Sequence, residues 1–338
     1  MFWIKHISFT FFSFLLYLSL SSSMAYGQCC SGASPIANSS TKAGLQKDQV
    51  QLNMNYQYLE SDYTLTGSQE ARFPMFEKVY ASYLYYSIGY GLTENLSLFV
   101  ENGYYINRTE RLLGGFEITG QGISDLIIHP KYDVININND KSLTELTLGL
   151  GSKIPIGNYN QEYIAFMNKS TGETIKLRKS AGIQPSTGTN DFIFSAFFYR
   201  SYFKNKISVR SNFTYLMRGT NPDGVNYGDI ANLSFGLNKS YSNGLSFGLD
   251  LKVETLDTIL DPVYFSYRYN SGGKKLSILP NINYLFRNNL TISVFSDFPI
   301  YQFVNGTQVA AEYLINFGIL YRFYPSTKHK ETESTKSS

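Results

Sequence analysis

The sequence predicts an all-β fold, a closed antiparallel transmembrane β-barrel of about 12 strands with short periplasmic turns and long outer loops. Three observations predict it. Bulky apolar residues recur at every second position in many segments, short turns alternate with long loops, and only 16% of the 338 residues are charged while 16% are aromatic. No segment of the mature chain is an apolar run long enough for a membrane-spanning helix, so the apolar rows are expected to face lipid.

Residues 1–27 are expected to be a cleaved signal peptide. Lys5 precedes an apolar block over residues 7–20, and the small residues Ala25 and Gly27 suit cleavage after Gly27. A membrane anchor is the weaker alternative, because the block is short and serine interrupts it. Export and a barrel fold together predict the outer membrane of a Gram-negative bacterium.

Residues 28–47 are expected to be a flexible leader that contains Cys29 and Cys30, the two cysteines of the chain, and that either stays in the periplasm or folds into the barrel mouth. Gln28 and Tyr26 do not fit a lipid-attachment signal at Cys29. A disulfide between adjacent cysteines is strained, so three alternatives stay open. The pair binds a soft metal ion such as Cu(I), bonds to another chain, or is simply exposed. No third thiol or nearby histidine completes a metal site, and no cofactor is expected.

Five expected strands form the first half of the barrel. In chain order they cover residues 49–58, 80–92, 96–106, 125–134 and 145–154. The first alternates apolar residues with amides, and each of the others has one row of Leu, Ile, Val or Tyr opposite a row of polar residues. Since successive side chains of a strand point to opposite faces, each segment has one apolar face and one polar face.

Seven further strands complete the barrel. They cover residues 191–203, 207–217, 232–238, 245–254, 278–286, 290–298 and 313–323. The alternation in residues 245–254 has no exception, and the apolar row of the last strand runs from Tyr313 to Phe323. In residues 191–203 both faces carry Phe or Tyr, so the orientation of that strand is the least defined.

The connections alternate in length. Short turns are expected near Glu94, Asn139, Asn205, Asn243 and Asn288, and long loops near Gly67, Gly115, Thr171, Pro222, Gly272 and Gly306. This alternation is typical of bacterial outer-membrane barrels, and an even strand number places both termini in the periplasm. Residues 48–324 are therefore expected to form the barrel, and the charged residues 325–338 a disordered tail. A soluble β-sandwich is the alternative, and it would have to bury every one of these apolar faces.

Several stretches also resemble a known family. They are residues 120–126 (Gly-Gln-Gly-Ile-Ser-Asp-Leu), 148–157, 184–192, 299–302 and 304–308. In order and spacing they resemble exported proteins named for the MetA pathway of phenol degradation, which are grouped with outer-membrane barrel transporters. The resemblance spans roughly residues 50–323 and implies transport of small organic molecules. It supplies no site residues, and the Cys-Cys leader is not part of the pattern.

The polar face of each strand supplies the residues expected to line the lumen. They are Gln51, Asn53, Asn55, Glu101, Asp125, His129, Lys131, Glu145, Lys153, Arg210, Asp250, Lys252 and Glu254. A barrel of this size encloses more space than one filled by its own side chains and less than a wide porin. These charges either select solutes or form salt bridges that fill the lumen, and both interpretations stay open.

The predicted function is an outer-membrane channel or transporter for small, hydrophobic or aromatic molecules, which diffuse through a narrow polar-lined lumen. The expected partners are outer-membrane lipids, the outer-membrane insertion machinery (through the C-terminal strand) and a small-molecule solute. A net charge of +3 without a basic cluster excludes nucleic-acid binding. No enzyme activity is expected. Two alternatives are a lipid hydrolase that uses His129 and a metal-handling barrel that uses Cys29 and Cys30.

Overall fold

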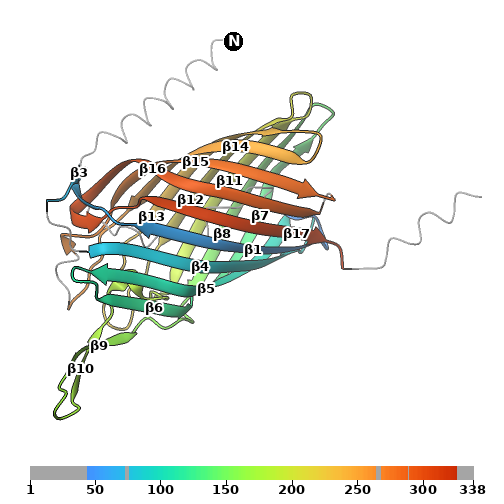
Figure 1. Cartoon of the computed structure of the whole chain (residues 1–338). Coiled ribbons are helices and arrows are strands. Elements are labelled where there is room, and N and C mark those ends of the chain that lie inside the picture. Colours follow the sequence, from blue (N-terminus) through green and yellow to red (C-terminus); the bar gives the residue numbers. More distant parts are fainter. Residues whose placement is uncertain (1–43, 73–75, 264–267, 288, 326–338) are drawn as a thin grey trace, which may run out of the picture.

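The computed structural model describes residues 44–72, 76–263, 268–287 and 289–325. Within them, twelve long antiparallel strands form a closed barrel (Figure 1). In chain order these are β1 (Val50–Ser61), β4 (Phe76–Gly91), β5 (Leu96–Leu112), β7 (Leu126–Asn138), β8 (Ser142–Ile154), β11 (Asp191–Tyr202), β12 (Ile207–Met217), β13 (Ile230–Ser240), β14 (Leu245–Leu256), β15 (Gly273–Phe286), β16 (Leu290–Val309) and β17 (Tyr313–Phe323). Each strand pairs with its neighbour along the chain, and β17 pairs with β1 to close the barrel. The predicted fold class is confirmed.

Short elements occupy the long connections. They are β2 (Thr64–Gly67), β3 (Gln69–Glu70), β6 (Glu117–Ile123), β9 (Glu162–Met167), β10 (Thr174–Arg178) and the 3-10 helix η2 (Ala181–Ile183). β6 pairs with the end of β5, and the β9–β10 hairpin projects beyond the barrel (Figure 1). The long loop expected near Gly306 is instead the end of β16, which pairs with β2 there and leaves only residues 310–312 before β17. Pairing with a segment far away in the sequence determines that strand end, so local periodicity does not reveal it.

The outer surface of the barrel is apolar. Along β14, Leu249 and Leu251 are 53% and 49% exposed, whereas Asp250, Lys252 and Glu254 are at most 8% exposed. The apolar row therefore faces outward and the charged row faces the barrel interior. A closed barrel pairs every strand edge internally, which satisfies the backbone groups that lipid cannot. This barrel accordingly spans a membrane.

The two ends of the barrel differ. Residues 92–95, 139–141, 203–206 and 241–244 make short turns at one end, here called the turn end, and the longer connections lie at the other, the loop end. Both chain ends leave the barrel at the turn end, because Val50 pairs with Phe323 there. In bacterial barrels the short turns are periplasmic, so the loop end faces outward from the cell.

The expected signal peptide (1–27), most of the leader (28–47) and most of the tail (325–338) lie outside the described residues. Their boundaries stay predictions. Among the residues that the structure does describe, no helix is long and apolar enough to cross a membrane.

Replacing Leu249 with Lys tests the lipid-facing surface. A lysine near the middle of a lipid-facing strand costs about 2–4 kcal/mol of folding free energy, so Leu249→Lys should lower the stability of the barrel in lipid vesicles by that amount. Urea titration measures this stability, with the folded and unfolded protein distinguished by their mobility on gels. Leu249→Ala is the apolar control, and equal stability of the Lys and Ala variants would argue that this surface does not contact lipid.

Candidate functional site

The thirteen residues expected to line the lumen lie on the less exposed faces of their strands. Ten of them are at most 8% exposed, and Asn53, Lys131 and Arg210 are half-buried. Asn53, Asn55, Asp250 and Lys252 alternate with exposed apolar residues on the same strand, as expected for the inward row of a barrel. Their role in selecting solutes stays a prediction.

Opposite charges pair on one wall of the barrel. Arg210 of β12 donates to both carboxylate oxygens of Asp250 on β14, at 2.9 and 2.7 Å. Lys252 donates to Asp297 of β16 and lies 4.0 Å from Glu254. Sequence reasoning missed Asp297, which belongs to a strand expected to end one residue later. These pairs neutralise one another, so this wall fits the salt-bridge interpretation of the lumen charges.

Two further inward side chains lie near the turn end. Arg322 of β17 is half-buried and Glu145 of β8 is 5% exposed, and four strands of the barrel wall separate them. The Nε atom of Arg322 donates to Gln51 on β1 at 2.8 Å. Both side chains therefore belong to the inward rows of their strands, close to the turn end of the barrel.

His129 lies against the barrel wall. From β7 its Nε2 atom reaches Ser195 Oγ on β11 at 3.0 Å, and its Nδ1 atom is 3.8 Å from Glu101. The ring crosses the intervening strand β8 at Gly149, where a Cβ atom would lie 2.4 Å from Nε2. Glycine is therefore required there. His129 is only 1% exposed, so this Ser-His-Glu row binds three strands together.

A segment of the long β8–β11 connection folds into the loop end of the lumen. We call residues 183–189 the inward loop. Ile183, Gln184, Ser186 and Thr189 within it are at most 3% exposed, although no barrel strand contains them. A buried loop needs partners for its polar groups, and those partners define the candidate site.

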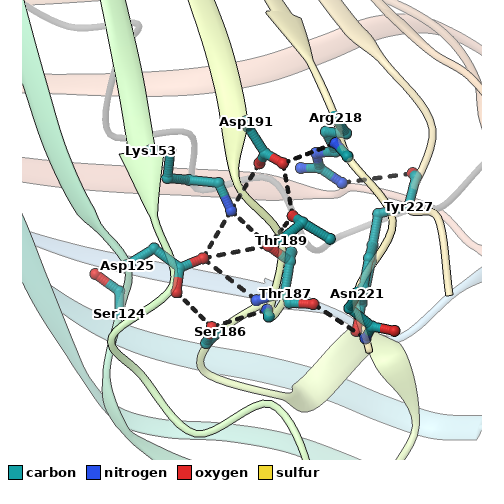
Figure 2. Close-up of polar contacts among 12 residues, drawn as sticks. Ser124, Asp125, Lys153, Ser186, Thr187, Thr189, Asp191, Arg218, Asn221 and Tyr227 are labelled. Carbon is teal, nitrogen blue, oxygen red and sulfur yellow. Dashed lines mark hydrogen bonds and ion pairs between the residues drawn. The ribbon is translucent and has the colours of Figure 1, made fainter. Parts of the chain in front are cut away.

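Lys153 and two carboxylates anchor the inward loop. The Nζ atom of Lys153 lies 2.6 Å from Asp125 and 2.8 Å from Asp191 (Figure 2). Asp125 accepts hydrogen bonds from the hydroxyl of Ser186 and, at 3.3 Å, from the backbone N–H of Thr187. The ion pair thus joins β7, β8 and β11 to the loop. Asp191 is fully buried, and a buried carboxylate needs an opposite charge beside it, which Lys153 supplies.

The opposite side of the inward loop contacts two more elements. Arg108 of β5 donates to the carbonyl of Gln184 at 2.8 Å, and Asn221, between β12 and β13, donates to the carbonyl of Thr187 at 3.2 Å. Burial lowers the pKa of nearby Arg218, while the negative charge of Asp191 acts in the opposite direction. The loop is therefore held from around the lumen, and Figure 2 shows Arg218 directed toward Asp191.

Three of the stretches that carry the family resemblance meet at this site. Asp125 comes from residues 120–126, Lys153 from residues 148–157, and Ser186 and Asp191 from residues 184–192. Sequence reasoning identified Asp125 and Lys153 but missed the other two, because the segment before Asp191 has no strand period. Its run of hydroxyl and amide residues was the available signal.

The lumen is polar only in part. Tyr83, Tyr85 and Tyr105 form a buried cluster on β4 and β5, and the rings of Tyr83 and Tyr105 lie 4.4 Å apart. Tyr83 and Tyr85 pair with Gln57 and Asn55, so they share the inward face with those amides. The expected polar lining is therefore interrupted by aromatic side chains. The sequence left this undetected because tyrosine occurs on both faces of β4.

An inward aliphatic cluster lies on another part of the wall. It consists of Ile127, Ile193, Leu216 and Ile230. Ile127 pairs with Lys153 and so shares its inward face. Apolar side chains therefore surround the polar anchor of the inward loop.

No metal site is present among the described residues, where no group of three or more His, Cys, Asp or Glu side chains is placed to hold an ion. Cys29 and Cys30, the candidate metal ligands from the sequence, lie outside the described residues. Their role stays a prediction.

Replacing Lys153 with Met tests the anchor. The side chains of Lys153, Asp125 and Asp191 are at most 10% exposed, and removing one partner of a buried ion pair costs about 3–5 kcal/mol. We expect Lys153→Met to lower folding stability by that order and to speed tryptic cleavage after Lys179, just before the inward loop. Lys239→Met, at an exposed site, is the control and should change stability by less than about 1 kcal/mol. Unchanged stability and cleavage in Lys153→Met would contradict the assignment.

Comparison with known proteins gives structural similarity only. No family model matches the sequence, and no curated protein matches it. The structure is similar to a COG4313 outer membrane channel from Pseudomonas putida F1, with a TM-score of 0.62 and 12% identity over 83% of this chain and 97% of that one. The β domain of the Bordetella autotransporter BrkA gives a TM-score of 0.47 and 9% identity over 81% and 99%. The first similarity and the apolar exterior of the closed barrel agree: this chain is a β-barrel of the bacterial outer membrane.

Proposed function

We propose that the protein is a channel through which small solutes diffuse across the outer membrane. The observation that carries this proposal is the inward loop, which narrows the loop end of a closed barrel and is anchored by Asp125, Lys153 and Asp191. Loops and charged side chains that constrict a lumen set the size and polarity of what passes. The similarity to an outer membrane channel supports the same function.

We propose small aromatic or other hydrophobic molecules as the solutes. The inward tyrosines and the aliphatic cluster offer apolar contacts, and the amides beside them offer hydrogen bonds. An aromatic solute with one or two polar substituents can make both kinds of contact along the lumen. Several weak binding sites of this kind let a solute both enter and leave a channel. The resemblance to the phenol-degradation family supports this solute class, although no family model matches.

Two further partners belong to this proposal. Outer-membrane lipids cover the apolar exterior. The insertion machinery of the outer membrane would recognise β17, whose exposed row includes Phe317, Ile319 and Tyr321 and which closes the barrel against β1.

Vesicle swelling tests the channel and its solute class. Phenol itself crosses lipid, so the assay should compare phenylalanine, a slowly permeant monoaromatic solute, with glucose, which is similar in mass. Vesicles that contain the refolded protein should swell severalfold faster in phenylalanine than in glucose, because the ring contacts the inward tyrosines.

Two tyrosine variants provide the matched pair for that assay. Tyr105→Ala removes an inward ring and should reduce the preference for phenylalanine, whereas Tyr86→Ala removes a ring that is 42% exposed on the lipid side and should not. Swelling no faster than in protein-free vesicles, for both solutes, would sink the channel proposal.

We propose no enzyme activity, but one arrangement favours a lipid hydrolase as the second candidate. His129 Nε2 lies 3.0 Å from Ser195 Oγ, the geometry of a base beside a nucleophile. If Ser195 is a nucleophile, a fluorophosphonate probe should label the wild-type protein and fail to label Ser195→Ala. We expect no labelling of either, because both side chains are buried against the wall. Phospholipid hydrolysis that is lost in His129→Ala would reverse this conclusion.

A further inference from the structure

The N-terminal segment before the barrel lies inside the turn end. We call residues 44–48 the entry segment. Leu45 is only 2% exposed, although it precedes the first strand by five residues. Its backbone N–H donates to Ser97 Oγ of β5 at 2.9 Å, and the same hydroxyl is 3.4 Å from the Leu45 carbonyl. A residue of the expected flexible leader is thus seated against the inner wall.

The entry segment runs along the inner wall from β7 to β1. Gly44 lies against the carboxylate of Asp133 on β7, and Leu45 lies against β5. The carbonyl of Gln46 approaches Gly91 on β4, and the N–H of Asp48 donates to the Gly91 carbonyl at 2.9 Å. The segment therefore covers the inner face of three strands before it enters β1.

The wall is shaped to accept this segment. A Cβ atom at Gly91 would lie 1.8 Å from the carbonyl oxygen of Gln46, and one at Gly89 would lie 2.9 Å from Leu45 Cδ1 and 2.5 Å from Phe99. Neither glycine has the positive φ that would by itself explain its presence. Close approach of the entry segment explains Gly91, and the Phe99 ring together with Leu45 fills the space beside Gly89.

A second contact to the segment comes from the residue that follows β17. Tyr324, directly after β17, donates its hydroxyl to the side chain of Gln46. Two residues earlier along the chain, Arg322 donates to Gln51 of β1 at 2.8 Å. The entry segment and the paired ends of β1 and β17 therefore lie together at the periplasmic mouth.

We propose that the periplasmic mouth of the barrel is a binding surface for the chain's own entry segment, which narrows the solute path at that end. The occupant is residues 44–48, and the seat is formed by Ser97, Phe99, Asp133 and the two wall glycines. The inference rests on the proposed channel function. It adds a second constriction, at the end of the lumen opposite the inward loop.

Removal of the segment is the first test. A mature chain that begins at Asp48 should give severalfold faster vesicle swelling and higher single-channel conductance in planar bilayers than the full mature chain. Leu45→Ala should give part of that increase. Leu52→Ala removes a leucine from the lipid-facing side of β1 and is the matched control. It should leave the swelling rate and the conductance unchanged. Heat-dependent gel mobility establishes that each variant is folded.

Locking the segment in place is the second test, and it does not depend on folding of the truncated chain. A Cβ atom at Gly44 would lie 2.5 Å from Asp133 Cγ, which puts cysteines at the two positions within disulfide reach. In a Cys29→Ser, Cys30→Ser background, the Gly44→Cys, Asp133→Cys variant should form the bond, and reduction should raise its conductance above the oxidised value. Asp133→Cys alone should not respond to reduction.

The outcomes separate the two proposals. If no variant conducts, the channel proposal fails. A second outcome is that the full chain conducts while the truncated and the reduced variants show the same conductance as the full chain. In that case the channel proposal stands, and the entry segment does not narrow the solute path. Failure of the two cysteines to bond under oxidising conditions would also overturn the placement of the segment.

Discussion

The pairing of β17 with β1 is the interaction on which the rest of the structure depends. It joins eleven residue pairs, from Val50 with Phe323 to Glu60 with Tyr313, and it removes the two edges that the strand series would otherwise expose. Inside lipid, an unpaired strand edge leaves backbone groups that nothing can satisfy. The barrel is therefore complete only when its first and last strands pair. The side chains of each strand then face either the lipid or the lumen.

This division into a lipid-facing and a lumen-facing side explains which face of the strands carries charged residues. A charge in the middle of the outward face would stand in lipid, and the charged residues of β14, Asp250, Lys252 and Glu254, lie inward and buried. An inward charge then needs an opposite charge nearby, and Arg210 with Asp250 and Lys153 with Asp125 satisfy this need. The same pairs that make the interior stable also position the inward loop. Structural and functional interpretations of the lumen charges are thus compatible at Lys153.

Period-two patterns predicted the parts of this protein that repeat. The twelve barrel strands were predicted in this way, and the inward orientation of residues such as Asp250 followed from alternation, whereas the orientation of residues 191–203 did not. The inward loop did not, because residues 183–189 have no period and their partners lie as far as 76 residues away, as Arg108 is from Gln184. The inward tyrosines of β4 were hidden for a different reason: tyrosine suits a lipid interface and a buried wall equally. Local pattern thus defines the barrel, and contacts between distant segments define the site.

The two narrow regions of the lumen differ in construction, and the difference bears on how each one can open. The inward loop is held by hydrogen bonds to buried charged groups, namely Arg108, Asp125 and Lys153, so its release would remove hydrogen-bond partners from these charges. The entry segment is held by the Leu45 side chain, by hydrogen bonds between neutral groups and by one exposed hydrogen bond from the Tyr90 hydroxyl to the Asp48 carboxylate. Neutral hydrogen bonds contribute little net stability because water replaces them. In the channel that we propose, the entry segment is therefore the constriction that opens at the lower free-energy cost, because the inward loop is joined to more buried charged groups.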